Sequence, residues 1–197
     1  FWVKDVPFNS IMVENLRIMG DIADKLGRKE DALHFRQEQI LITAAMRELM
    51  FEDGVFWSTY GADYKKIRVK TWAMFSPLFA KIFSDGEAKN LVDKHLLNPK
   101  EFLSTYPLPT VAMDDPSYDP AGFWRGPTWI AVNWFIFQGL IKYGFLEEAE
   151  RIRKSSYELI ERSGFREHFH PETGEGLGAK DFTWGTLVID MGKIKGL

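Results

Sequence analysis

The sequence predicts an all-α protein, a toroid built from helical hairpins. Apolar residues recur at helical spacing in seven segments, while signals for strands are nearly absent. Within each pair of neighbouring helices, one is apolar on almost every side and the other is apolar along one stripe. The connections within a pair are short, and the connections between pairs are long. These three observations predict an inner ring and an outer ring of helices.

The apolar spacing places the seven helices at about 9 to 26, 29 to 50, 71 to 83, 86 to 97, 127 to 143, 146 to 163 and 182 to 192. Asn9 and Ser10 can cap the first helix, and Gly27 can end it. Pro77 lies inside the third helix and predicts a kink or break there, because proline lacks the N–H that a helix interior requires. Pro127 is well placed as the first residue of the fifth helix.

The two helices of a pair differ in how their apolar residues are distributed. The 127 to 143 helix carries apolar side chains in almost every direction, which is typical of a helix buried on all sides. The 146 to 163 helix has one apolar stripe and a charged opposite face. The 71 to 83 and 86 to 97 helices show the same contrast. We therefore expect the first helix of each pair in the inner ring and the second in the outer ring.

Three long connections join outer helices to inner ones, at about 51 to 70, 98 to 126 and 164 to 181. All three are therefore expected at the same end of the molecule. The 98 to 126 connection contains five prolines, which restrict its backbone and suit it to holding the shape of a site. Because binding groups concentrate in loops on a rigid scaffold, this end is where we expect the functional site.

The composition of the chain excludes several classes of function. Its 197 residues are 45% hydrophobic and 27% charged, which predicts one ordinary folded domain over residues 1 to 197. A net charge of −3, from 25 basic and 28 acidic residues, argues against a nucleic-acid partner. No apolar run is long enough to span a membrane. The chain has no cysteine, which fits a reducing compartment, and we expect a cytoplasmic location.

The segment FWRGPTW, residues 123 to 129, has the composition of a sugar-binding wall. The rings of Phe123, Trp124 and Trp129 offer flat apolar surfaces, and the guanidinium of Arg125 can bind hydroxyls or a carboxylate. Trp184 opens the last helix in a position like that of Trp129. Core packing is the alternative for the tryptophans, because buried rings are common in helical proteins.

A loop contact is the alternative for Arg125, since it can equally pin the loop through Asp114 or Asp115. These two aspartates precede a proline and are interpreted as turn-forming residues, with a catalytic role as the alternative.

The 164 to 181 connection contains four acidic residues, and glycosidic cleavage uses two carboxyl groups that flank the bond. Glu167 lies between aromatic neighbours on a segment expected to be extended, which makes it the catalytic candidate. Glu172 and Glu175 belong to the turn sequence PETGEG, and Asp181 follows it. A solvated carboxylate or a loop ion pair is the alternative for Glu167.

His168 and His170 are spaced like a pair of metal ligands, but no third ligand of suitable type lies nearby in the sequence. We therefore expect no metal site, and we interpret both as structural or substrate-contacting histidines.

At these motifs the sequence resembles glycoside hydrolase family 63 and its relatives, a group that includes mannosyl-oligosaccharide glucosidase and the mannosylglycerate and glucosylglycerate hydrolases. The matching stretches span nearly the whole chain and are DVPFNS (5 to 10), LPTVAMDDPSY (108 to 118), FWRGPTWIAVNW (123 to 134), GFREHFHPETGEGLG (164 to 178) and FTW (182 to 184). The resemblance implies an (α/α)6 barrel, an inverting mechanism and no cofactor. It implies a general base at Glu167 and sugar contacts from Trp124, Arg125, Trp129, Trp184, Phe123 and His168.

Two departures from the family pattern limit what the resemblance implies. The family carries its general acid as an Asp in an upstream Asp-Asn-Ser-Pro-like motif, which this chain lacks, and a barrel needs twelve helices. We therefore expect the C-terminal part of a barrel, inactive alone, whose inner helices are covered by the rest of the barrel or by another chain. Smaller departures are Phe123, where relatives often have Tyr, and Gly185, where they often have Thr.

Three functions follow as hypotheses. The first is an inverting α-glycosidase that acts on a glucosyl or mannosyl substrate. The second is a trehalase-like or debranching glucosidase. The third is a non-catalytic module that binds carbohydrate or another partner and retains the aromatic wall.

Overall fold

The computed structural model describes residues 2 to 192 and shows that the prediction of an all-α protein is wrong. These described residues are 54% helical and 12% strand, and their strands form three small antiparallel sheets. The strands are β1 (Val3–Lys4), β2 (Phe51–Glu52), β3 (Val55–Phe56), β4 (Thr59–Tyr60), β5 (Lys65–Lys66), β6 (Arg166–Phe169) and β7 (Gly176–Lys180). Their order is β1-β4-β5 in one sheet, β2-β3 in the second and β6-β7 in the third.

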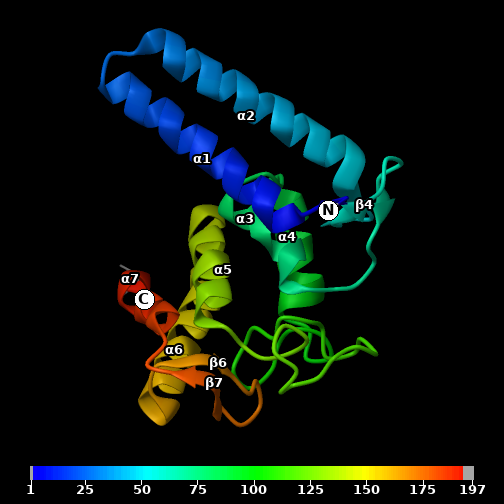
Figure 1. Ribbon diagram of the computed structural model, residues 1–197, viewed down its shortest axis with the longest axis vertical. Helices are drawn as coiled ribbons and strands as arrows, with labels where there is room; N and C mark the ends of the chain where they lie inside the picture. The colour runs from blue at the N-terminus through cyan, green and yellow to red at the C-terminus, as the bar shows by residue number, and fades with distance from the viewer. Residues whose placement is uncertain (1, 193–197) are drawn as a thin grey trace.

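The helical segments lie close to where the apolar spacing predicts them. They are α1 (Val6–Lys25), α2 (Lys29–Met50), η1 (Trp72–Phe75), α3 (Ser76–Phe79), α4 (Asp85–Leu91), η2 (Val92–Leu96), α5 (Ile130–Tyr143), α6 (Leu146–Ser163), η3 (Thr183–Thr186) and α7 (Leu187–Met191). The hairpins α1–α2 and α5–α6 each pack along a shared face, as Figure 1 shows for the first. The predicted break at Pro77 is confirmed, because η1 gives way to the short helix α3 there.

Two helix starts differ from the prediction for identifiable reasons. Asp5 caps α1 in place of Asn9 or Ser10, and its Oδ2 accepts a hydrogen bond from the Phe8 N–H at 3.2 Å. The fifth helix begins at Ile130 and not at Pro127. Thr128 instead pairs with Phe169 in an antiparallel bridge, with N···O distances of 2.8 and 2.9 Å in the two directions. This bridge holds the start of α5 against β6.

The predicted gathering of the long connections at one end is confirmed by isolated bridges between them. Thr71 pairs with Val111, and Thr128 pairs with both Pro109 and Phe169. The Ala112 N–H also donates to the Lys70 carbonyl at 2.9 Å. The ends of all three connections therefore lie side by side, and Figure 1 shows the 98 to 126 loop beside β6 and β7.

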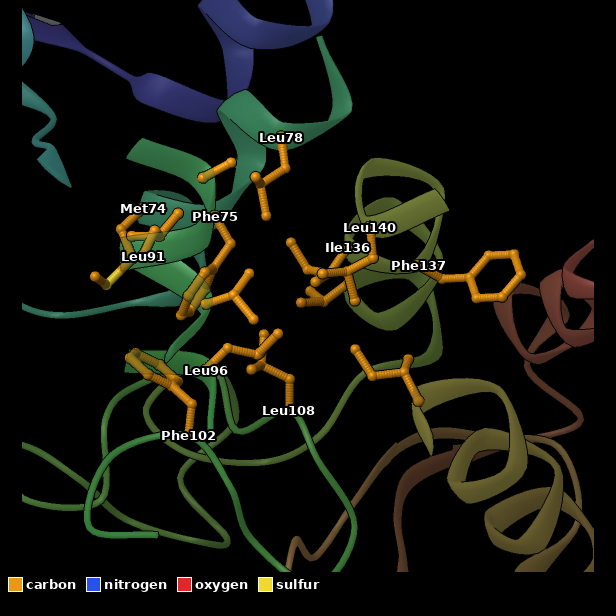
Figure 2. Packing of buried hydrophobic residues seen from close by; sticks show 14 of the residues in the cluster. Met74, Phe75, Leu78, Leu91, Leu96, Phe102, Leu108, Ile136, Phe137 and Leu140 are labelled. Carbon is orange, nitrogen blue, oxygen red and sulfur yellow. The ribbon is translucent and has the colours of Figure 1, made fainter. Parts of the chain in front are cut away.

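The hydrophobic core lies between η1–α3, α4 and α5. In Figure 2 the side chains of Phe75 and Leu78 point toward Ile136 and Leu140 of α5, and Leu108 comes from the long loop beneath them. No residue of α5 is exposed, which matches the expectation of a helix buried on all sides. The core thus rigidly supports the segment from which the FWRGPTW motif leads into α5.

Gly139 is a point of close approach between α5 and α3. A Cβ atom at this position would lie 2.7 Å from Leu78 Cβ and 2.9 Å from the Phe79 N atom. We expect Gly139→Ala to lower the free energy of unfolding by about 1–3 kcal/mol, because overpacking outweighs the gain of about 1 kcal/mol in helix propensity. Urea denaturation measures the change. Gly86→Ala in α4 is the matched control, since nothing lies within 4 Å of its Cβ position, and it should be neutral or stabilising.

The start of α4 carries an acid-sensitive contact. Glu87 forms a capping box with Ser84 and a salt bridge with Arg47, with Arg47 Nη2 2.7 Å from Glu87 Oε1. The hydrogen bonds from Arg47 outweigh the opposing effect of burial and lower the pKa of Glu87 from 4.5 to about 2. Because this pKa is lowered by folding, its contribution to stability is complete above about pH 4.5 and is lost as the pH falls toward 2. Urea titrations across this range should show a weaker acid dependence in Glu87→Gln than in the unsubstituted protein.

Exposed apolar side chains lie along the α1–α2 hairpin. They include Phe8, Met12, Met19, Ile22, Leu33, Ile40 and Leu41, each more than two-fifths exposed. A continuous exposed apolar surface is unusual for an isolated protein. Coverage of this surface by the rest of a barrel or by another chain stays a prediction. Within residues 2 to 192, no helix is both long enough and apolar enough to cross a membrane.

Candidate active site

Five of the predicted site residues form one group, the aromatic cluster, which consists of Phe123, Trp124, Trp129, His168 and Trp184. The Trp124 and Trp129 rings are stacked, with centroids 4.0 Å apart and an interplanar angle of 9°. His168 stacks on Trp129 with centroids 4.9 Å apart. Phe123 lies edge-on to Trp129 at 5.3 Å, and Trp184 is tilted against Trp129 at 5.7 Å. Rings from the long loop, β6 and η3 thus meet around Trp129.

The backbone of the FWRGPTW segment is fixed on both sides. The Asp119 N–H donates to the Arg125 carbonyl at 2.8 Å, and the Gly126 N–H donates to Thr110 Oγ1 at 3.0 Å. A Cβ atom at Gly126 would overlap the Asp119 carbonyl, so only glycine allows this approach. The Trp129 indole N–H donates to the Phe123 carbonyl at 3.1 Å. The rings are therefore presented by a loop with little freedom to move.

Solvent reaches only part of the aromatic cluster. Phe123, Trp184 and Trp124 are 50%, 44% and 38% exposed, whereas Trp129 is 2% exposed. The exposed rings provide the flat apolar surface that the sequence predicts for sugar binding. For Trp129 the structure favours the alternative of core packing, because Trp124 and His168 cover its two faces. Trp129 therefore supports the ring of Trp124 from behind.

His168 is buried in the stack and is 5% exposed. Burial lowers its pKa below 6.5, despite the opposing effect of the neighbouring Glu167 carboxylate. Its Nδ1 atom is buried and has no hydrogen-bond partner among residues 2 to 192. The second histidine, His170, has a structural role, since its Nδ1 accepts the N–H groups of Glu172 and Thr173. The described part of the chain contains no group of three or more His, Cys, Asp or Glu side chains that could hold a metal ion.

Glu167 lies on β6, directly before His168 and half buried. Its Oε2 atom accepts a hydrogen bond from the Ala179 N–H on β7, at 3.1 Å. Glu172 is directed elsewhere, because its Oε2 accepts a hydrogen bond from the Thr105 hydroxyl at 2.7 Å. Glu167 Oε2 and His168 Cε1 both lie close to the position that a Cβ atom of Gly178 would take, so the carboxylate lies next to the His168 ring of the aromatic cluster.

Arg125 forms a loop contact in this structure. Its Nη2 atom lies 3.0 Å from Asp119 Oδ2, so the loop alternative is supported, with Asp119 in place of the expected Asp114 or Asp115. Asp114 pairs with Lys70, and Asp115 accepts the N–H of a residue two positions later in a turn. A contact between Arg125 and a sugar stays a prediction.

A cavity next to Trp124 was missed by the sequence reasoning. It has a volume of about 360 Å³, and its lining includes Asp5, Trp57, Trp72, Thr110 and Trp124. The DVPFNS stretch, which contains Asp5, could have indicated this cavity. It matches the family pattern but was not assigned to the site. A larger cavity of about 700 Å³ lies between α6 and the 103 to 107 loop segment, and no member of the aromatic cluster lines it.

Comparison with known proteins places the chain in a family. Residues 1–185 match the model of the mannosylglycerate hydrolase MGH1-like glycoside hydrolase domain. The mannosylglycerate hydrolase of Thermus thermophilus is 34% identical over 95% of this chain and 45% of its own length. The enzyme of the same name from Rubrobacter radiotolerans is 30% identical over 97% of this chain and 44% of its own length.

A solved structure gives the same result at the level of the fold. The crystal structure of a GH63 mannosylglycerate hydrolase from Thermus thermophilus in complex with glucose superimposes with a TM-score of 0.87 and 32% identity. The match covers 96% of this chain and 47% of that protein. The chain thus spans about half the length of the relatives it matches. The aromatic cluster, its adjacent carboxylate and these matches together show that the chain belongs to the MGH1-like glycoside hydrolases of glycoside hydrolase family 63.

Proposed function

We propose that residues 1 to 197 form the part of an inverting glycoside hydrolase that carries the general base. The enzyme would cleave a glucosyl or mannosyl bond. The observation that carries the proposal is the position of Glu167, a half-buried carboxylate beside His168, whose ring belongs to the aromatic cluster. Its hydrogen bond from the Ala179 N–H leaves the second carboxylate oxygen available to a water molecule. Glycosidic cleavage uses two carboxyl groups that flank the bond, and Glu167 would supply one of them.

In this mechanism Glu167 is the general base. Its carboxylate accepts a proton from a water molecule, and the water oxygen forms a bond to the anomeric carbon as the glycosidic bond breaks. A general acid on the other face of the sugar protonates the departing oxygen, and the configuration at the anomeric carbon is inverted. We infer, from the family resemblance, that an Asp outside residues 1 to 197 supplies this acid.

The exposed rings of the aromatic cluster are proposed to orient the sugar. Trp124 and Trp184 would stack on its apolar faces, and Phe123 would close one side. Trp129 and His168 would hold the Trp124 ring in place through the stack. A glycerate conjugate of mannose or glucose is the first substrate to test, because the relatives are named for hydrolysis of mannosylglycerate.

Hydrolysis by the full-length protein tests the proposal directly. The panel contains mannosylglycerate, glucosylglycerate, trehalose and short α-glucosides, and NMR follows the anomer that is first released. Release of the inverted anomer from one of the glycerate conjugates is the expected result. Release from trehalose or an α-glucoside alone would favour the trehalase-like or debranching alternative. Binding of a sugar without any hydrolysis would favour a non-catalytic module.

A further inference from the structure

The hairpin of β6 and β7 is irregular at the position of Glu167. Arg166 pairs with Lys180, and His168 pairs with Leu177. One residue of β6, Glu167, therefore faces two residues of β7, Gly178 and Ala179. An extra residue on one strand defines a β-bulge, and bulges next to active sites commonly redirect a side chain.

The conformation of Gly178 identifies the type of bulge. Its φ angle is +65°, in the left-handed region that favours glycine. A glycine in this conformation at the first bulge position is the arrangement of a G1 bulge. The second bulge residue is Ala179, whose N–H donates to Glu167 Oε2 at 3.1 Å. In this geometry the bulge directs a backbone donor to the carboxylate.

Glycine at position 178 also leaves room for the carboxylate. A Cβ atom there would overlap Glu167 Oε2 and would lie 2.9 Å from Glu167 Cβ and 2.8 Å from His168 Cε1. Real Cβ atoms do not approach other heavy atoms so closely, so the Glu167 side chain or the strand would have to move. Gly178 therefore contributes to the position of Glu167 twice, through its backbone conformation and through its missing side chain.

We propose that Gly178 and Ala179 are positioning residues for the general base, and that this bulge sets the direction of the Glu167 carboxylate toward the attacking water. This inference rests on the proposed function of Glu167. A Cβ atom at Gly178 would meet Glu167 and His168, and the Ala179 N–H donates to Glu167, so the bulge acts on the base and not on a ring proposed to stack on the sugar. Its loss should therefore affect the chemical step more than substrate binding.

The first test is Gly178→Ala in the full-length protein, assayed on the substrate identified by the panel. A displacement of the base by about 1 Å is expected to lower kcat by about 10²-fold, with KM changed less than about threefold. Gly144→Ala is the matched control, because Gly144 has a similar φ of +78° at the end of α5 and nothing within 4 Å of its Cβ position. Gly144→Ala introduces the strain of a positive φ without a steric overlap, so this control should keep its kcat. Thermal unfolding of both variants separates loss of folding from loss of function.

The second test removes the bulge in another way. Deletion of Ala179 leaves one residue of β7 opposite Glu167, which restores a regular ladder and removes the N–H donor. Its kcat should also fall by about 10²-fold. In a Glu167→Gln background, Gly178→Ala should lower kcat little further, because the effects of two substitutions that act through the same group are not additive.

The outcomes distinguish this inference from the proposed function. If Glu167→Gln retains its turnover, the assignment of the base is wrong and the proposed function fails. If Glu167→Gln is inactive while Gly178→Ala and the Ala179 deletion keep normal kcat values, the base is correct and the positioning role is refuted. The positioning role would also be refuted if Gly178→Ala lowered kcat by the same factor in the Glu167→Gln background as in the unsubstituted protein.

Discussion

Replacement of Glu167 by glutamine in the full-length protein is expected to lower kcat by about 10²–10⁴-fold, the usual contribution of a general base. Glutamine has nearly the same shape and can still accept the Ala179 N–H through its amide oxygen. It cannot take a proton from water, so the chemical step is lost while the site keeps its form. Steady-state kinetics and sugar binding by calorimetry measure the two effects separately, and we expect binding to stay within about threefold of the unsubstituted value.

Glu172→Gln is the matched control for this prediction. Glu172 lies five positions further along the same connection and bonds to the Thr105 hydroxyl rather than facing the aromatic cluster. The same chemical change there should leave kcat unaffected. Turnover by Glu167→Gln at the normal rate would rule out Glu167 as the base, and a loss in both variants would point to a general requirement for negative charge in this connection.

The helices of this protein could be predicted from sequence because their apolar residues repeat over many turns. The α5 segment is the clearest case, since its apolar side chains cover almost all directions and none of its residues is exposed. The strands could not be predicted in the same way, because five of the seven strands within residues 2 to 192 contain only two residues, which is too short for an alternating pattern. The β2–β3 hairpin did leave a signal in Asp53-Gly54, whose φ angles of 54° and 82° suit the turn that this dipeptide favours.

The sequence predicts which residues form the candidate site, but it does not predict how they are arranged in space. The rings of Phe123 and Trp124 were recognisable from their spacing around a Gly-Pro turn, while the buried state of Trp129 depends on His168, which is distant in sequence. The partner of Arg125 was unpredictable for a similar reason, because several aspartates in the same loop are within reach. The bulge opposite Glu167 is set by the register of two strands, which composition does not reveal.

Removal of one exposed ring should weaken the site without stopping its chemistry. Trp124 is 38% exposed and lies on the stack formed by Trp129 and His168, so a sugar that covers it would bury an apolar surface that is already held in place. Burial of an aromatic side chain contributes about 1.5–3 kcal/mol, and each 1.4 kcal/mol is a factor of ten. We expect Trp124→Ala to lower kcat/KM by about 10–100-fold, mainly through a higher KM, because the Glu167 carboxylate is held by β7 and not by this ring.

Trp2→Ala is the control that separates stacking in the site from the general loss of an exposed tryptophan. Trp2 is 68% exposed and lies next to β1, where Lys4 is the neighbour of its ring. Its removal should leave kcat/KM unchanged. An equal loss in both variants would show that Trp124 acts through stability. A fall in kcat without a change in KM in Trp124→Ala would mean that the ring contributes to the chemical step. That result would follow if the stack of Trp124 with Trp129 and His168 also fixed the strand that carries Glu167.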